Sequence, residues 1–397
     1  MKRFVIIAVL WLSCATVFAQ WENVEAWNVV EPKTVESGHK YQWYEDQACA
    51  WQKVVSADPK NETAWRNLFR ASYLYEYYRV GIYRHSYESP MTDGVLRKMK
   101  EAIPDSYAFY ISLCQDWLSE WGEFDPNILI KALKNVPDDI SSHELGPLIF
   151  RLWRYNPESI YLEGLFRNLY VKRYYSERIM RYGWNLMQSM QKDAIYIARS
   201  WYQYEQMVMM QYIFDERKDI IVLSYDDLLS DDNYRKDICK RLKLKPFVAG
   251  NYYDGDENTH VASDFIDYLK HRCDRPFYLS LDLAHSTHLE VDSLYNEGLL
   301  IRYTEKRYDN VHVALHNVQE VYDLNYLIQP NFMYDPDGSA QYVDNNVVYS
   351  LKILSEKFED FGYTDAARRL RKFLEKVYNR DSGYYYYYIR RMFSINK

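Results

Sequence analysis

The chain has 397 residues, of which 48% are hydrophobic and 26% are charged, and it contains only 13 glycines. This composition excludes a disordered or fibrous chain and predicts a sizeable core divided over two or three modules. The net charge of -7 argues against a nucleic-acid partner, because nucleic-acid binding favours a basic surface. The 41 tyrosines predict wide, partly hydrated packing surfaces, since each ring buries area while its hydroxyl seeks a partner.

The first nineteen residues have the organisation of a secretory signal peptide. Two basic residues precede the apolar run 4–12, and the segment ends at Ala19 with the small residues that signal peptidases require. We expect cleavage before Gln20, and therefore a periplasmic, secreted or cell-surface protein without a transmembrane span in the mature chain. Two alternatives stay open. One is an uncleaved membrane anchor, for which the apolar run is short, and the other is lipidation of Cys14.

Residues 20–190 are predicted to form a helical, repeat-like domain. Pro59, Trp65 and Leu68 keep the spacing of a junction between two tetratricopeptide repeats, and a weaker echo of this pattern follows Pro157. Stacked helical hairpins of this kind present a concave surface that binds peptides or proteins. The alternative is that these helices only support the rest of the chain.

A small α/β module is predicted over residues 191–305. The runs 194–197 and 220–223 are short, apolar and rich in β-branched residues, and helical spacing between them completes a βαβ unit. Further strands are expected within 275–283 and 297–303. Because the strands of a βαβ unit pair in parallel, we expect a mostly parallel sheet.

Polar and aromatic side chains follow the first two predicted strands. They are Arg199, Ser200, Trp201, Tyr225, Asp226 and Asp227. Ligands of open α/β sheets bind beyond the carboxyl ends of the strands, so these six residues form the predicted ligand-binding site. Arg199 and Asp226 are its best candidates. If the second turn begins a helix, the adjacent Asp226 and Asp227 would instead stabilise the helix dipole.

No complete motif for catalysis, a metal or a cofactor occurs in the sequence. His285, His288 and Glu290 follow the third predicted strand without a full set of zinc ligands. Residues 254–265 begin like a calcium loop, but Thr259 stands where the loop requires glycine. We therefore predict no metal, no cofactor and no catalytic residue.

Four cysteines follow the predicted leader, namely Cys49, Cys114, Cys239 and Cys273. Their wide spacing fits neither a CxxC motif nor a zinc site. We expect four buried free thiols. A disulfide between Cys239 and Cys273 is the alternative for an exported protein.

Residues 306–397 are predicted to form C-terminal helical hairpins and a tyrosine-rich tail. Leu351, Leu354 and Phe358 follow the spacing of a tetratricopeptide repeat. The run Tyr384 to Tyr388 favours an edge strand or a packed tail. The predicted fold is therefore α-rich α+β, with tetratricopeptide-like helical hairpins on both sides of a small central α/β module.

Three stretches in the second half of the chain carry a resemblance to a known family. They are DAIYI at 193–197, RKDIIVLS at 217–224 and RPFYLSL at 275–281, the last followed by EGL at 297–299. Their order resembles the soluble module of Bacteroidetes O-mannosyltransferase-like membrane proteins, which tetratricopeptide-like hairpins often follow. The transmembrane catalytic part of that family is missing here, and its acidic turn after the first strand is replaced by residues 198–201. The resemblance therefore implies an exported binding or accessory module and no transferase activity.

The stretch 220–244 is also similar to the late strand, loop and helix of sulfotransferases. Those enzymes need an early glycine- and lysine-containing loop for nucleotide phosphates, and the sequence has none. We therefore expect an exported, non-catalytic binding or scaffold protein of the cell envelope that recognises a protein or glycan partner. The alternative is a group-transfer enzyme of the sulfotransferase or glycosyltransferase type.

Overall fold

The structure, a computed structural model, describes residues 30–36, 38–80, 90–116, 125–137, 140–250, 257–285, 287–328 and 339–379. The predicted signal peptide and the tyrosine-rich tail lie outside these residues, as does the start of the calcium-like loop. The chain divides into two compact units, Met1–Ile140 and Ser141–Lys397. In the described ranges, no helix has both the length and the hydropathy that crossing a membrane requires.

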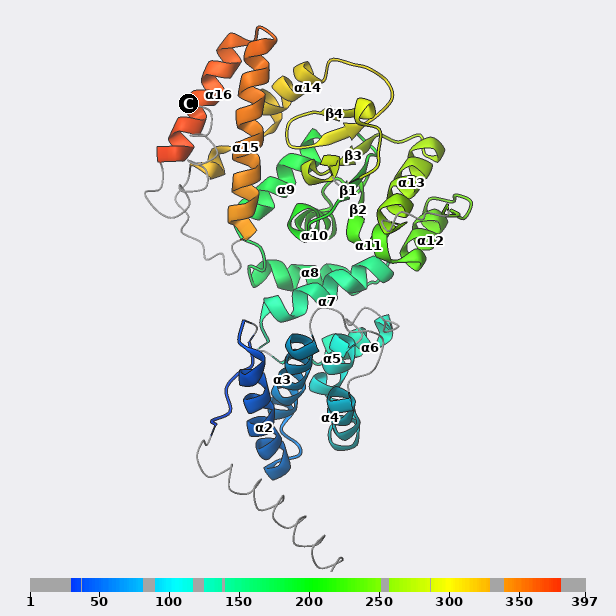
Figure 1. Cartoon of the computed structure of the whole chain (residues 1–397), viewed down its shortest axis with the longest axis vertical. Coiled ribbons are helices and arrows are strands. Elements are labelled where there is room, and N and C mark those ends of the chain that lie inside the picture. Colours follow the sequence, from blue (N-terminus) through cyan, green and yellow to red (C-terminus); the bar gives the residue numbers. More distant parts are fainter. Residues whose placement is uncertain are drawn as a thin grey trace, which may run out of the picture. The chain divides into compact units, whose positions relative to one another are not determined.

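The first unit is built from helices. They are α2 (Tyr41–Ala57), α3 (Glu62–Val80), α4 (Pro90–Ala102), α5 (Tyr107–Asp116) and α6 (Pro126–Lys134). A short turn containing Pro59 joins α2 to α3, which pack against each other (Figure 1). The side chain of Asn61 begins α3 by accepting from the Ala64 amide at 2.9 Å, as an N-cap does. Trp65 and Leu68 are buried in the core of this unit, and the helices expected on either side of Pro59 are present, whereas their tetratricopeptide character stays a prediction.

The second unit is a helix-rich α+β structure with a five-stranded sheet. Its helices are α7 (Ser142–Tyr155), α8 (Leu162–Val171), α9 (Glu177–Ser189), α10 (Glu205–Phe214), α11 (Tyr225–Ser230), α12 (Asp232–Arg241), α13 (Glu257–Arg272), α14 (Asn310–His316), α15 (Ser339–Asp360) and α16 (Thr364–Asn379). Its strands are β1 (Ile195–Ala198), β2 (Ile221–Ser224), β3 (Phe277–Leu279), β4 (Leu294–Asn296) and β5 (Ile301–Tyr303). Helix-rich architecture with a small sheet was predicted from the sequence and is confirmed.

The sheet is mixed, with the strand order β2-β1-β3-β5-β4. β1 pairs in parallel with β2 and β3, as the βαβ prediction required. β5 pairs antiparallel with both β3 and β4. The expectation of a mostly parallel sheet is not confirmed. β4 and β5 pair antiparallel because the connection between them is short, whereas a parallel pair needs a crossover of a dozen or more residues.

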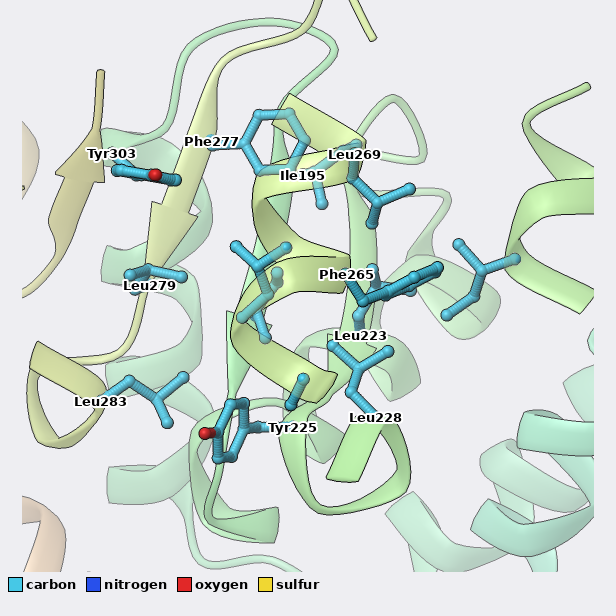
Figure 2. Close-up of a cluster of buried hydrophobic side chains, with 14 of the residues drawn as sticks. Ile195, Leu223, Tyr225, Leu228, Phe265, Leu269, Phe277, Leu279, Leu283 and Tyr303 are labelled. Carbon is cyan, nitrogen blue, oxygen red and sulfur yellow. The ribbon is translucent and has the colours of Figure 1, made fainter. Parts of the chain in front are cut away.

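Alternating residues of the strands face different layers of helices. Ile195, Leu223 and Phe277 belong to the core that α11, α12 and α13 complete, and Figure 2 shows Phe265 of α13 packed among them. Because successive side chains point to opposite faces of a sheet, Tyr196 faces away from this cluster. α9 and α10 lie on that other side of the strands (Figure 1).

Helices α7 to α9 belong to the same compact unit as the sheet, whereas the sequence analysis grouped them with the N-terminal helices. The predicted domain boundaries at residues 190 and 305 stay predictions. Near the C-terminus, α15 and α16 form the expected hairpin, with Phe358 fully buried. Gly362 turns the chain between them with a φ of +85°, a conformation that glycine adopts without a steric cost.

The cysteines differ from expectation at two positions. Cys114 and Cys239 are buried, but Cys273 is partly exposed and Cys49 is exposed. Burial is therefore only partial at Cys273, and the expectation is wrong for Cys49. It lies in α2, where Tyr44, Ala48 and Val55 form the buried stripe and the position after Ala48 points away from it.

Candidate functional site

The turn after β1 presents an exposed tryptophan. Ser200 directly follows Arg199, and its backbone amide donates to Oε1 of Gln203 at 3.2 Å, which fixes a single helical turn over Trp201–Gln203. The Trp201 ring stacks on the ring of Tyr175, with the centroids 5.8 Å apart and the planes inclined by 20°. Trp201 is still 38% exposed. An aromatic surface is therefore held in place at this edge of the sheet.

The turn after β2 begins helix α11. Some of its residues stabilise the fold, and Asp226 is exposed to solvent. Oγ of Ser224 accepts from the Asp227 amide at 3.4 Å and caps the helix. Tyr225 is buried and contributes to the core beside Leu228, as Figure 2 shows. Asp226 is 62% exposed by side-chain area. The sequence placed Tyr225 in the ligand site, whereas the structure places its ring in the hydrophobic core.

Arg199 and Asp226 come together, as predicted. Nε of Arg199 lies 3.6 Å from Oδ1 of Asp226, and both side chains are about half exposed or more. Partial burial at the base of the turn raises the pKa of Asp226, and the neighbouring carboxylates of Asp227 and Asp282 add to the rise, while Arg199 opposes it. Exposed ion pairs of this kind contribute only about 0–1 kcal/mol, so both groups are available to a ligand at little cost.

Asp282, just after β3, joins this cluster from the third parallel strand. Oγ of Ser280 donates to its Oδ1 in a short hydrogen bond, and Oγ of Ser200 donates to its Oδ2 at 3.4 Å. The ends of β1, β2 and β3 therefore meet, because parallel neighbours end at the same edge of a sheet. From the sequence, Asp282 was predicted only as a possible metal ligand. Its place at this edge depends on the pairing of β3 with β1, which no local pattern indicates.

Asp227 is bound to another helix. Nη1 of Arg154, from α7, donates to Oδ2 of Asp227 at 2.9 Å and to Oδ1 at 3.0 Å. The next residue, Tyr155, donates its hydroxyl to Oδ2 of Asp231 at 2.7 Å. These two contacts attach α7 to the start of α11 and α12. Asp227 therefore has a structural role, and the candidate ligand site that remains comprises Arg199, Trp201, Asp226 and Asp282, with Ser200 hydrogen-bonded to Asp282.

A buried carboxyl group is hydrogen-bonded to Tyr175, the residue on whose ring Trp201 stacks. Glu205, in the first turn of α10, is 5% exposed and accepts a short hydrogen bond from the hydroxyl of Tyr175. Burial raises the pKa of Glu205 from 4.5 to about 8, while the hydrogen bond from Tyr175 and the charge of Arg154 act in the opposite direction. Sequence reasoning missed both residues, since only the fold brings Tyr175 and Glu205 together.

The site combines hydrogen-bond acceptors, one flexible cation and one aromatic surface. In the part of the chain that the structure describes, no group of three histidine, cysteine or acidic side chains could hold a metal ion. His288, which the sequence analysis weighed as a ligand, instead stacks its ring on His260 with the centroids 3.9 Å apart. The arrangement suits the recognition of a polar molecule that also has an apolar face.

Comparison with known proteins found no matching family model and no matching curated protein. The resemblance to the soluble module of Bacteroidetes O-mannosyltransferase-like proteins therefore stays a prediction.

Proposed function

We propose that this protein is an exported, non-catalytic binding protein of the cell envelope, and that the sheet edge of its second unit recognises a glycan partner. The observation that carries the proposal is Trp201, an exposed ring stacked on Tyr175 in the turn that also contains Arg199, which pairs with Asp226. Large aromatic side chains with exposed area, next to a few polar groups, are typical of ligand-binding surfaces.

A glycan fits the chemistry of this edge better than a purely charged ligand. The C–H face of a sugar ring packs against an aromatic ring, while its hydroxyls donate to carboxylates such as Asp226 and Asp282. Arg199 can donate to the ring or hydroxyl oxygens, because its pairing with Asp226 is weak and exposed. Hydrogen bonds to charged groups contribute about 1.5–3 kcal/mol each, so one such contact changes affinity by about 10- to 150-fold.

The proposal is tested by probing the chain 20–397 against arrays of glycans and of peptides. We expect binding to a defined set of glycans, and a loss of at least about tenfold in affinity for Trp201→Ala and for Asp226→Asn. Trp184→Ala is the matched control, since Trp184 is 36% exposed on α9. Asp232→Asn is the second control, because the Asp232 side chain is 61% exposed, close to the value for Asp226.

The binding results distinguish a glycan site from a site for a protein partner and from no site at this edge. Binding that both site variants lose and both controls keep supports a glycan site at the sheet edge. Binding to peptides alone, with the same dependence on Trp201, would replace the glycan by a protein partner. Affinity that does not change in either site variant contradicts the proposal.

A group-transfer enzyme is the second candidate, and the buried Glu205 favours it. A carboxyl group whose pKa lies near 8 can hold a proton at neutral pH and release it to a reaction, and such groups are frequent in active sites. Thermal stabilisation by nucleotide-activated sugars or by a nucleotide sulfate donor, together with turnover that Glu205→Gln abolishes, would favour the enzyme. Stabilisation by none of these donors would favour the binding protein.

We also propose a tetratricopeptide-like character for two hairpins, α2–α3 and α15–α16, and cleavage of a signal peptide after Ala19. The buried Trp65 and Leu68 after the Pro59 turn support the first part, since they occupy positions that such repeats bury. The basic and apolar start of the chain supports the second. N-terminal sequencing of the protein from its native cell should begin at Gln20, and an intact Met1 would contradict cleavage.

A further inference from the structure

Two cysteines far apart in the sequence contribute to the same hydrophobic core. Cys239 lies in the last turn of α12 and is buried, and Cys273 directly follows α13 and is partly exposed. Cys273 continues the helical hydrogen bonding of α13, with its amide donating to the Leu269 carbonyl at 2.8 Å. Both side chains pack in the cluster that α11, α12 and α13 build against the sheet.

Contacts of the segment that follows α12 hold it against the last turns of α13. The chain leaving α12 passes along α13, where the Tyr268 hydroxyl donates to the Lys245 carbonyl at 2.6 Å. Two residues on, the ring of Phe247 lies 5.1 Å from that of Phe265 and 5.5 Å from that of Tyr268. The chain that follows Cys239 is therefore held against the helix turns that precede Cys273.

The two thiols also share an electrostatic environment. Burial raises the pKa of both, and Cys239 contributes to the rise at Cys273. Both cysteines in turn contribute to raising the pKa of Tyr268, whose first cause is burial. All three groups therefore lie in one neighbourhood, at the same end of α13.

We propose that Cys239 and Cys273 are a disulfide-forming pair that covalently links α12 to α13 when the protein meets a disulfide oxidant. Such oxidants are present in the compartment to which an exported chain would go. The inference concerns a place in the fold different from the proposed ligand site. It would hold or fail independently of glycan binding.

The reaction proceeds by two exchanges with a small-molecule disulfide. Cys273, the more exposed of the two, loses its proton and its thiolate attacks one sulfur of the reagent, which releases one thiolate and leaves a mixed disulfide. The Cys239 thiolate then attacks the sulfur of Cys273 and releases the second half of the reagent. Two protein thiols become one disulfide, and the two electrons reduce the reagent to two thiols.

The test uses the chain 20–397 with oxidised glutathione as the probe. After acid quenching, alkylation and non-reducing digestion, mass spectrometry should find a linked peptide pair containing Cys239 and Cys273. Cys239→Ser should keep one glutathione on Cys273, because the second exchange has no attacking thiol. Cys49→Ser is the control, and it should form the same linked pair as the parent chain.

Two further readouts test the role of the fold and of the thiolates. Below the pKa of the thiols, the reaction should accelerate about tenfold per pH unit, since only the thiolate attacks. In denaturant, the preference for the Cys239–Cys273 pair should disappear. The proposal is overturned if the folded parent chain retains glutathione on Cys273 without forming the linked pair, or if its linked peptides contain Cys49 or Cys114 as often.

Discussion

Replacing Glu205 by glutamine should remove a pH dependence from the stability of the second unit. Glutamine keeps the shape and the acceptor that Tyr175 needs, but it cannot ionise. In the folded protein Glu205 holds its proton up to a pKa of about 8, whereas in the unfolded chain it releases the proton near its ordinary value of 4.5. Between these values the folded state binds more protons than the unfolded state, so stability falls as the pH rises.

The size of the effect follows from the same values. A rise in pKa from 4.5 to about 8 corresponds to about 5 kcal/mol, since one unit is worth about 1.4 kcal/mol. Relaxation around the charged carboxylate reduces this, and we expect about 2–5 kcal/mol. At pH 5 the variant and the parent should unfold at similar free energies, within about 1 kcal/mol. At pH 9 the variant should be the more stable by the full amount.

Urea unfolding of both proteins at intervals from pH 5 to pH 9 measures this difference. The matched control is Glu163→Gln, because Glu163 lies on the exposed side of α8 and pairs with the exposed Arg167. That change should alter stability by less than about 0.5 kcal/mol at every pH. A difference between the parent and Glu205→Gln that stays constant over the whole range would refute the reasoning.

Two further predictions concern the packing of the second unit. Gly298→Ala should destabilise it by about 2–4 kcal/mol, because the added Cβ would lie 2.6 Å from the Tyr322 hydroxyl at a φ of +117°. Gly164→Ala, in open space on α8, should instead stabilise it by about 0.5–1 kcal/mol. Phe265→Ala should cost about 3–5 kcal/mol, since the ring is fully buried, whereas the exposed Val248→Ala should cost less than about 0.5 kcal/mol. Urea unfolding measures all four. Equal effects within either pair would contradict the packing described here.

The first two strands could be predicted from the sequence because they are apolar, short and bounded by turns. Their ends agree with the structure to within one residue. β4 escaped prediction, since Leu294–Asn296 is only partly buried and does not form an apolar run. The mixture of parallel and antiparallel pairing could not be predicted either, because the order of strands depends on contacts between residues far apart in the chain.

The candidate site, too, could be predicted only in part. The approach of Arg199 to Asp226 could be predicted, since β1 and β2 pair in register up to Ala198 and Ser224. The direction of Tyr225 could not, because it depends on whether the turn continues as a strand or begins a helix. The contact between Arg154 and Asp227 could not be predicted from the sequence either. It joins residues 73 positions apart, and no local pattern marks such a pair.

The proposed function rests on Trp201, and site-specific photocrosslinking tests it most directly. A photoreactive phenylalanine analogue at position 201, and in a second protein at position 184, would be irradiated in the native envelope fraction. The proposal predicts one defined glycan-containing adduct from position 201, absent from position 184 and lost when Asp226 is also changed to asparagine. Equal labelling from both positions, or labelling from position 201 that is unchanged by Asp226→Asn, would contradict the proposed function.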